Sequence, residues 1–235
     1  MGGLLPSWKG FERGGIKTPE DVSKHWEEVN ASHKMILDGD VWIEDPLNSS
    51  SPPSIAFKAA QLQDNDKAIT FLRRLKEFVF LEKRNITRWK IIENAALSSG
   101  LDAALLKNDI ISDGYKLFEE DLALNKEMGI EVFPTFFFKK DGIIKKTIKG
   151  YEPYEVFEDI IKELLPEAQK KAERFSPVTV FSMFHNMTEE EYAFVTNTPL
   201  AETSTILNQL HEQLIINKYD SKYGVVWMYN LNANI

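Results

Sequence analysis

The sequence predicts an α/β protein, because the spacing of its apolar residues changes along the chain from a helical to a strand period. From residue 55 to about residue 126, apolar side chains recur every three or four positions, as on the buried face of a helix. Between residues 130 and 148, two β-rich runs flank an Asp-Gly turn, which is typical of a hairpin. An amphipathic helix follows the hairpin. The sequence thus combines a helical bundle with a small strand-and-helix unit.

Length and charge limit the class of protein. The chain has 235 residues, of which 43% are hydrophobic, so it can bury the core of one domain with appendages or of two small domains. Its net charge of -8 argues against a generally basic nucleic-acid surface, although a local basic patch stays open. Neither an export signal nor a bilayer-spanning apolar run is apparent, so we expect a cytoplasmic protein without membrane contact.

The chain contains no cysteine. This composition fits a reducing compartment and excludes structural disulfides and thiolate metal ligands within these residues. The four histidines, at positions 25, 33, 185 and 211, are too scattered for two of them to share a metal with a carboxylate on one helix face. We therefore predict no metal site and no cofactor.

One short and four longer predicted helices precede the hairpin. The first 54 residues, which end in DPLNSSSPPS, are expected to be connective, with one short helix around DVSKHWEEV. The first of the longer helices has Ile55 and Leu62 on its apolar face, and the next has Ile69 on its apolar face. A third ends at Gly100, and a fourth is SDGYKLFEEDLALNKEMG.

The hairpin segment begins with GIEVFPTFFFKKDG, residues 129 to 142. The three phenylalanines after the Pro-Thr pair are what a strand covered on both faces requires. Gly150 closes the second strand, and EPYEVFEDIIKELLP is an amphipathic helix that Pro166 ends. Pro134 has two interpretations: a rigid turn that enters an edge strand, or a cis-proline in a binding loop.

The pattern over residues 129 to 165 resembles the C-terminal half of thioredoxin. Upstream, GGLLPSW, GDVWIEDP and GLDAALLKNDI resemble the helical insertion of DsbA-like proteins, in their FrnE/SpxH-like cytoplasmic branch. The resemblance implies an incomplete thioredoxin-like fold over residues 1–166, with a helical insertion at about 55–126. In that family, a strand and a C-x-x-C helix precede the GGLLP segment, and the expectation is that this chain lacks them.

The resemblance also implies a site and a function class. The Phe133-Pro134 bond would be cis, and Phe133, Pro134 and Thr135 would bind an extended polypeptide client. The family consists of disulfide oxidoreductases and isomerases, but without cysteine this chain is expected to be redox-inactive, so no catalytic residue is assigned. The alternative is a non-enzymatic adaptor that grips a client and presents it to a protease. Whether the protein is an enzyme stays open, as does its oligomeric state.

Residues 175–235 form a separate prediction. Two helices and a hairpin around Ser221 to Gly224 resemble a winged helix, which adds a transcription factor as a third hypothesis. From Glu167 onward, however, five basic residues face eight acidic ones, and the helix in the recognition position, Glu202 to Leu214, has no Lys or Arg. We therefore predict a protein-interaction or packing module rather than a nucleic-acid reader.

Two further groups have ordinary structural interpretations. Glu189, Glu190 and Glu191 follow Thr188 and are expected to cap a helix start rather than form an acid-base pair. The tryptophans at positions 8, 26 and 42 either line a groove or anchor the N-terminal stretch to a core, and the sequence leaves them unassigned.

Overall fold

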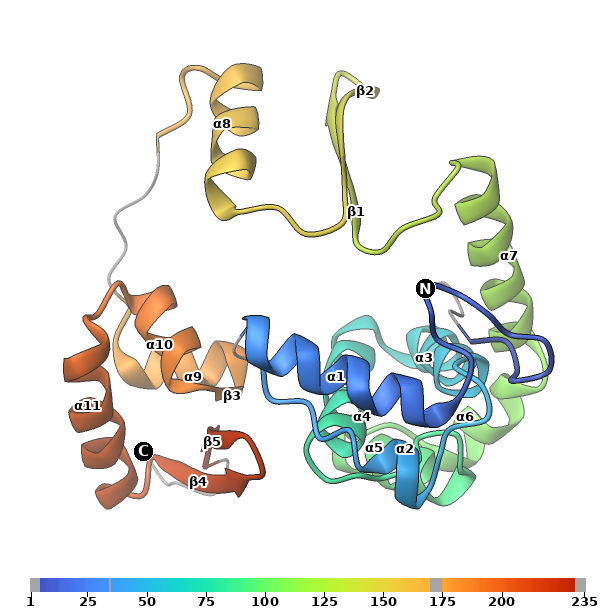
Figure 1. Ribbon diagram of the computed structural model, residues 1–235, viewed down its shortest axis with the longest axis horizontal. Helices are drawn as coiled ribbons and strands as arrows, with labels where there is room; N and C mark the ends of the chain where they lie inside the picture. Colours follow the sequence, from blue (N-terminus) through green and yellow to red (C-terminus); the bar gives the residue numbers. More distant parts are fainter. Residues whose placement is uncertain (1–4, 34, 170–174, 231–235) are drawn as a thin grey trace. The chain divides into compact units, whose positions relative to one another are not determined.

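The computed structural model describes residues 5–33, 35–169 and 175–230 (Figure 1). The chain divides into two compact units. The first combines Met1–Glu119 with Arg174–Ile235, and the second is Glu120–Glu173. The predicted domains, residues 1–166 and 175–235, are based on sequence resemblance and remain a prediction. Each compact unit contains both helices and strands.

The first unit is built around a bundle of helices. Asp64 begins one of them, since its carboxylate accepts hydrogen bonds from the backbone N–H groups of Asp66 and Lys67. Phe71 and Leu75 from the same helix are fully buried with alanines of its neighbours. The helices are α3 (Ser51–Gln63), α4 (Asn65–Phe80), α5 (Trp89–Ser98), α6 (Ala103–Ile110) and α7 (Asp113–Glu127), which crosses into the second unit.

Three details of this bundle differ from the prediction. The helix α6 was missed, because it is only eight residues long and lies between turn-forming residues. Leu62 and Ile69, which were expected on buried faces, are 46% and 64% exposed. Both expectations were wrong because the faces that pack are set by the small residues Ala56, Ala59 and Ala68, which let the helices approach closely.

The N-terminal stretch is more than connective, which corrects the expectation for residues 1 to 54. It contains α1 (Pro19–His33) and α2 (Val41–Glu44). Leu5, Val41 and Trp42 are buried with Val79 of α4, so this stretch has an apolar cluster of its own. The indole of Trp42 meets those of Trp8 and Trp26 edge to face, with ring centroids 6.1 and 5.6 Å apart. The three tryptophans therefore act as anchors.

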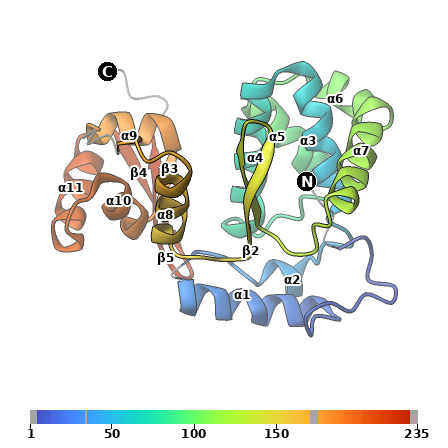
Figure 2. The ribbon, with the colours of Figure 1, turned by 90° about the horizontal axis from the view of Figure 1, so that it is seen from above.

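The C-terminal segment has a helix-strand-helix-helix-hairpin order (Figure 2). Its three-stranded sheet has the order β3-β5-β4, with both pairs antiparallel. Tyr192, Leu207 and Trp227 form the centre of its apolar core. The expected helices and hairpin are present, and α9 and β3 had not been predicted. The elements are α9 (Pro177–Phe184), β3 (Asn186–Met187), α10 (Glu189–Thr196), α11 (Leu200–Glu212), β4 (Ile216–Ser221) and β5 (Gly224–Tyr229).

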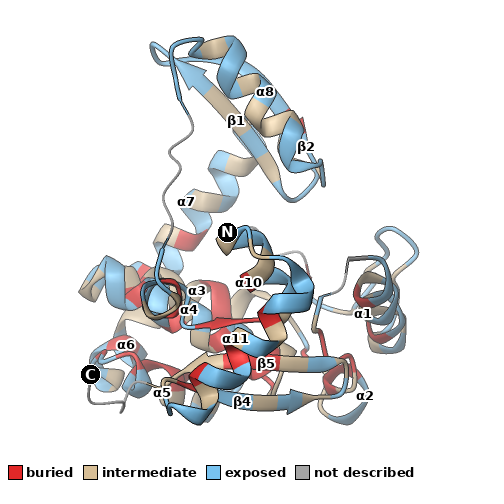
Figure 3. Ribbon diagram, turned by 90° about the vertical axis from the view of Figure 1, so that its left-hand side faces the viewer, coloured by how far each residue is buried: buried red, intermediate tan, exposed pale blue. Residues whose placement is uncertain are grey.

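The second unit contains the predicted hairpin, β1 (Thr135–Lys140) and β2 (Ile143–Lys149), followed by α8 (Tyr154–Leu164). Phe157 of α8 lies over one face of the hairpin, with ring centroids 4.9 Å from Phe136 and 6.1 Å from Phe138. Ile148 is the only buried residue among the described residues of this unit (Figure 3).

The expectation that β1 is covered on both faces was therefore wrong. The Phe136 side chain is 41% exposed, although it faces α8. The described residues of the unit supply a helix for one face of a two-stranded sheet and no second layer.

Candidate functional site

The proline loop, defined here as residues 132–135, ends at Thr135, the first residue of β1. The Phe133-Pro134 peptide bond is cis, which confirms the predicted geometry. The Pro134 carbonyl accepts a hydrogen bond from the Gly150 N–H at 2.8 Å, where Gly150 follows the end of β2. The Thr135 hydroxyl donates to the Val132 carbonyl at 2.6 Å. The first bond joins the loop to the residue after β2, and the second lies within the loop.

The proline loop is apolar and accessible. Val132 and Phe133 are 44% and 41% exposed, so about half of each side chain is open to solvent. Among the described residues, β1 pairs only with β2, which leaves the other edge of β1 with unpaired backbone groups. The three residues predicted to bind a client, Phe133, Pro134 and Thr135, thus lie together beside an open strand edge. Their role in binding remains a prediction.

The proline loop carries no thiol nucleophile and no metal centre in the described part of the chain. No cysteine is encoded, and no three His, Asp or Glu side chains gather as metal ligands among the described residues. The groups that the loop offers are backbone N–H and C=O groups and apolar surface. These groups can hold an extended chain by hydrogen bonds and burial.

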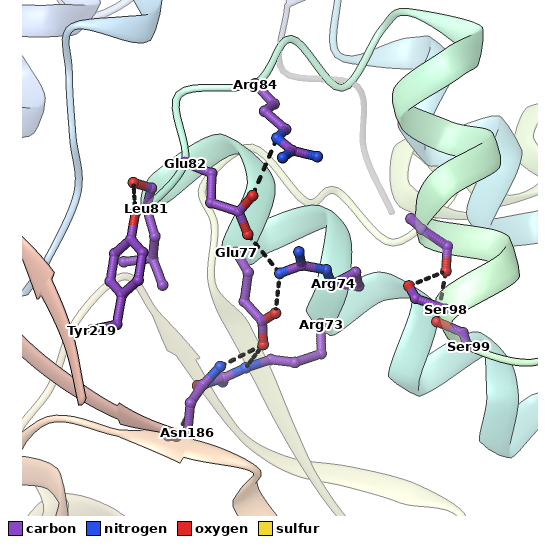
Figure 4. A network of polar contacts seen from close by, with 11 residues as sticks. Arg73, Arg74, Glu77, Leu81, Glu82, Arg84, Ser98, Ser99, Asn186 and Tyr219 are labelled. Carbon is purple, nitrogen blue, oxygen red and sulfur yellow. Dashed lines mark hydrogen bonds and ion pairs between the residues drawn. The ribbon is translucent and has the colours of Figure 1, made fainter. Parts of the chain in front are cut away.

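A second group of contacts joins the helical bundle to the C-terminal segment within the first unit (Figure 4). Its centre is Glu77 of α4, whose side chain is 13% exposed. The Glu77 carboxylate accepts a short hydrogen bond from the Asn186 side-chain amide of β3 and one from Arg74 at 2.7 Å. Arg73 donates to the Asn186 backbone carbonyl at 3.0 Å. The interface therefore pairs charged groups of α4 with both the side chain and the backbone of β3.

The hairpin of β4 and β5 makes further contacts across the same unit. The Tyr219 hydroxyl donates to the Leu81 carbonyl at 2.9 Å, and burial raises the pKa of this hydroxyl. Lys222 donates to the Asp40 carboxylate at 2.8 Å, and this hydrogen bond raises the pKa of the Lys222 ammonium. These contacts fix the C-terminal segment to the bundle at two further points.

Sequence reasoning did not identify the network around Glu77. The two sides of the contact between Glu77 and Asn186 are 109 residues apart, and the residues involved are common on helix surfaces. The only local signal is the density of charges in RRLKEF, residues 73–78, which is equally typical of a solvated helix.

The remaining candidates behave as ordinary structure. Thr188 and Glu191 form a capping box, since the Thr188 hydroxyl accepts from the Glu191 N–H and the Glu191 carboxylate accepts from the Thr188 N–H. None of the helices in the described residues has the length and hydropathy of a membrane span.

Known proteins resemble the chain in sequence and in structure. A family model described as thioredoxin matches residues 17–159. A ClpXP adapter protein SpxH from Halalkalibacterium halodurans is 32% identical, over 97% of this chain and 76% of that protein. A ClpXP adapter protein SpxH from Bacillus subtilis is 30% identical, over 88% of this chain and 71% of that protein.

Among solved structures, a candidate protein disulfide isomerase from Nitrosomonas europaea superimposes with a TM-score of 0.53. The match covers 64% of this chain and 74% of that protein at 14% identity, so it supports the fold alone. The family model spans more than half of the chain, and the SpxH proteins match nearly all of it. The chain belongs to the thioredoxin-like family, in the group that includes the SpxH proteins.

Proposed function

We propose that the protein is a non-enzymatic adaptor, which binds a polypeptide client and presents it to a protease of the ClpXP type. The observation that carries this proposal is the similarity to proteins named ClpXP adapter over 97% of the chain. The adaptor was the alternative in our sequence-based prediction, and this similarity supports it better than the disulfide oxidoreductase or isomerase class. That class is supported only by the fold of a distant structural neighbour.

The chemistry of the chain agrees with an adaptor. Thiol–disulfide exchange begins with the attack of a thiolate, and these 235 residues contain no thiol. An adaptor needs a binding surface only, so the absence of cysteine does not weaken the proposal. The partner is a polypeptide, and the compartment is the cytoplasm.

The proline loop is the proposed client site. An extended segment of the client would pair with the open edge of β1, as a strand added to a sheet. The exposed side chains of Val132 and Phe133 would supply apolar contact beside the new hydrogen bonds. Complete burial of a fully exposed phenylalanine stabilises a complex by about 1.5–3 kcal/mol. Because only 41% of Phe133 is left to bury, loss of its ring should weaken client binding by about three- to eightfold.

Reconstituted degradation tests the proposal. A client recovered with the tagged chain and identified by mass spectrometry would be purified and incubated with ClpXP, with and without the adaptor. We expect the chain to accelerate degradation and Phe133→Ser to abolish most of the acceleration. The matched control is Phe194→Ser, which removes a phenylalanine that is 72% exposed in the C-terminal segment.

Two outcomes would contradict the proposal. If no recovered client is degraded faster with the chain, the adaptor function is wrong. If Phe133→Ser and Phe194→Ser reduce the acceleration equally, the proline loop is not the client site.

A further inference from the structure

An open groove with a volume of about 590 Å³ lies in the first unit. The residues that line it are distant in sequence from the proline loop. One wall comes from the end of α1 and the residues after it, and the other comes from the start of α10 and from the β4–β5 hairpin. The volume lies in the range of about 300–1,000 Å³ that is typical of ligand sites. The lining residues are Glu27, Asn30, Ala31, Met35, Ile36, Glu189, Glu190, Tyr223, Gly224 and Val225.

A hydrogen bond joins the two walls of the groove. The Tyr223 hydroxyl donates to the Glu27 carboxylate at 3.4 Å, so the hairpin meets the end of α1 (Figure 2). Gly224 has no side chain, and a Cβ at this position would lie 3.5 Å from the Ile36 Cδ1 atom. The hairpin backbone at Gly224 therefore lies close to Ile36, with no side chain of residue 224 between them.

The groove is lined by apolar and acidic side chains. Ala31, Ile36 and Val225 supply aliphatic surface, and Met35 is 49% exposed. The lining contains three carboxylates and no Lys or Arg. Glu27 is partly neutralised, since the Lys222 ammonium lies 4.0 Å from its carboxylate.

The two other carboxylates are not neutralised by a cation in the described part of the chain. Glu189 accepts a short hydrogen bond from the neutral Ser204 hydroxyl, and Glu190 is exposed. No ion pair of either carboxylate is found among the described residues. The N-terminus of α10 offsets part of this negative charge, and the rest is available to a ligand.

We infer that this groove binds a segment of a protein partner in which an arginine is flanked by apolar side chains. The guanidinium would bind Glu189 and Glu190 by charge-assisted hydrogen bonds and lie against the Tyr223 ring. The neighbouring apolar side chains would cover Met35, Ile36 and Val225. Charge complementarity favours this occupant over an acidic or purely apolar segment. The inference does not depend on the adaptor proposal, because the groove and the proline loop share no residue.

Binding of a defined peptide to the full chain tests the inference. The probe is the fluorescein-labelled peptide Gly-Leu-Arg-Ile-Leu-Arg-Leu-Gly, and its affinity is measured by fluorescence polarisation. A peptide in which both arginines are replaced by glutamine is the first control. We expect the arginine peptide to bind at least about tenfold more tightly, since each charge-assisted hydrogen bond contributes that much.

Matched variants of the chain locate the site. Glu190→Lys should weaken binding of the arginine peptide at least about tenfold, because it places a cation in the lining of the groove. Glu202→Lys is the control, since Glu202 is also an exposed glutamate in the first turn of a helix but lies outside the groove. In the wild-type chain labelled with ¹³C-methyl methionine, the Met35 signal should shift when the arginine peptide is added.

Four results would overturn the inference. The arginine peptide does not bind at millimolar concentration, or the glutamine peptide binds equally well. Glu190→Lys and Glu202→Lys weaken binding equally, which would indicate general charge attraction. Phe133→Ser removes binding while the Met35 signal stays unchanged, which would place the peptide at the proline loop and leave the adaptor proposal intact.

Discussion

The hydrogen bond between Glu77 and Asn186 should stabilise the whole first unit, because it joins α4 to β3 across a largely buried interface. The Glu77 side chain is 13% exposed, and Asn186 is 5% exposed. A hydrogen bond to a charged group contributes about 1.5–3 kcal/mol when water is largely excluded. Glu77→Ala should lower the free energy of unfolding by about 3 kcal/mol, since Arg74 also loses a partner at the interface.

A double-mutant cycle separates the hydrogen bond from the rest of the network. The free energy of unfolding in urea would be measured by circular dichroism for the wild type, Glu77→Ala, Asn186→Ala and the double variant. We expect a coupling energy of about 2 kcal/mol, because the second substitution removes a group that has already lost its partner.

The control cycle combines Asn186→Ala with Glu44→Ala. Glu44 forms an ion pair with Lys83 at 2.6 Å and has no contact with Asn186, so the two effects should add to within about 0.5 kcal/mol. A coupling energy below about 0.5 kcal/mol for Glu77 and Asn186 would show that the interface does not depend on their hydrogen bond.

Three further predictions concern stability. Thr188→Ala should lower the free energy of unfolding, measured in urea, by about 1 kcal/mol, and Thr188→Ser by much less, because serine keeps the cap of α10. Equal losses would contradict the capping box. Phe71→Ala should lower the free energy of unfolding by about 3–5 kcal/mol, since the ring is fully buried in the helical bundle. A loss as small as that at an exposed position would contradict the burial of Phe71. Burial raises the pKa of Tyr192, so the folded state favours its neutral form. The contribution of Tyr192 to the free energy of unfolding is fully present below pH 10.0, the ordinary pKa of tyrosine. It is lost as the pH rises above that value, by up to about 1.4 kcal/mol per pH unit. Tyr192→Phe should make alkaline unfolding less steep, and an unchanged slope would contradict this account.

Elements with a strong local pattern were predictable from the sequence. The hairpin of β1 and β2 was, because Asp141-Gly142 sits between two β-rich runs, and both residues have positive φ in the structure. The amphipathic helix α8 and the capped helix α10 were predictable for similar reasons. The cis bond before Pro134 could be predicted because the flanking pattern as far as Gly150 resembles a known family.

Features that depend on contacts between distant segments could not be predicted. The N-terminal cluster joins Leu5 and Trp42 to Val79, and no periodic spacing links these positions. The groove forms where α1, α10 and the last hairpin meet, so its residues come from three separate parts of the sequence. Tertiary packing decides such sites, while local propensity decides the elements that carry them.

The small amount of buried surface around the proline loop has a consequence for how a client would be held. Ile148 is the only described residue of the second unit that is buried, so opening this unit should require much less free energy than unfolding α4. Its backbone amides should therefore exchange with deuterium before those of the helical bundle. A client strand added to β1 would order the unit as it binds, and part of the interaction energy would go into that ordering. The proposed adaptor would then release its client readily, which suits a protein that transfers its cargo to another machine.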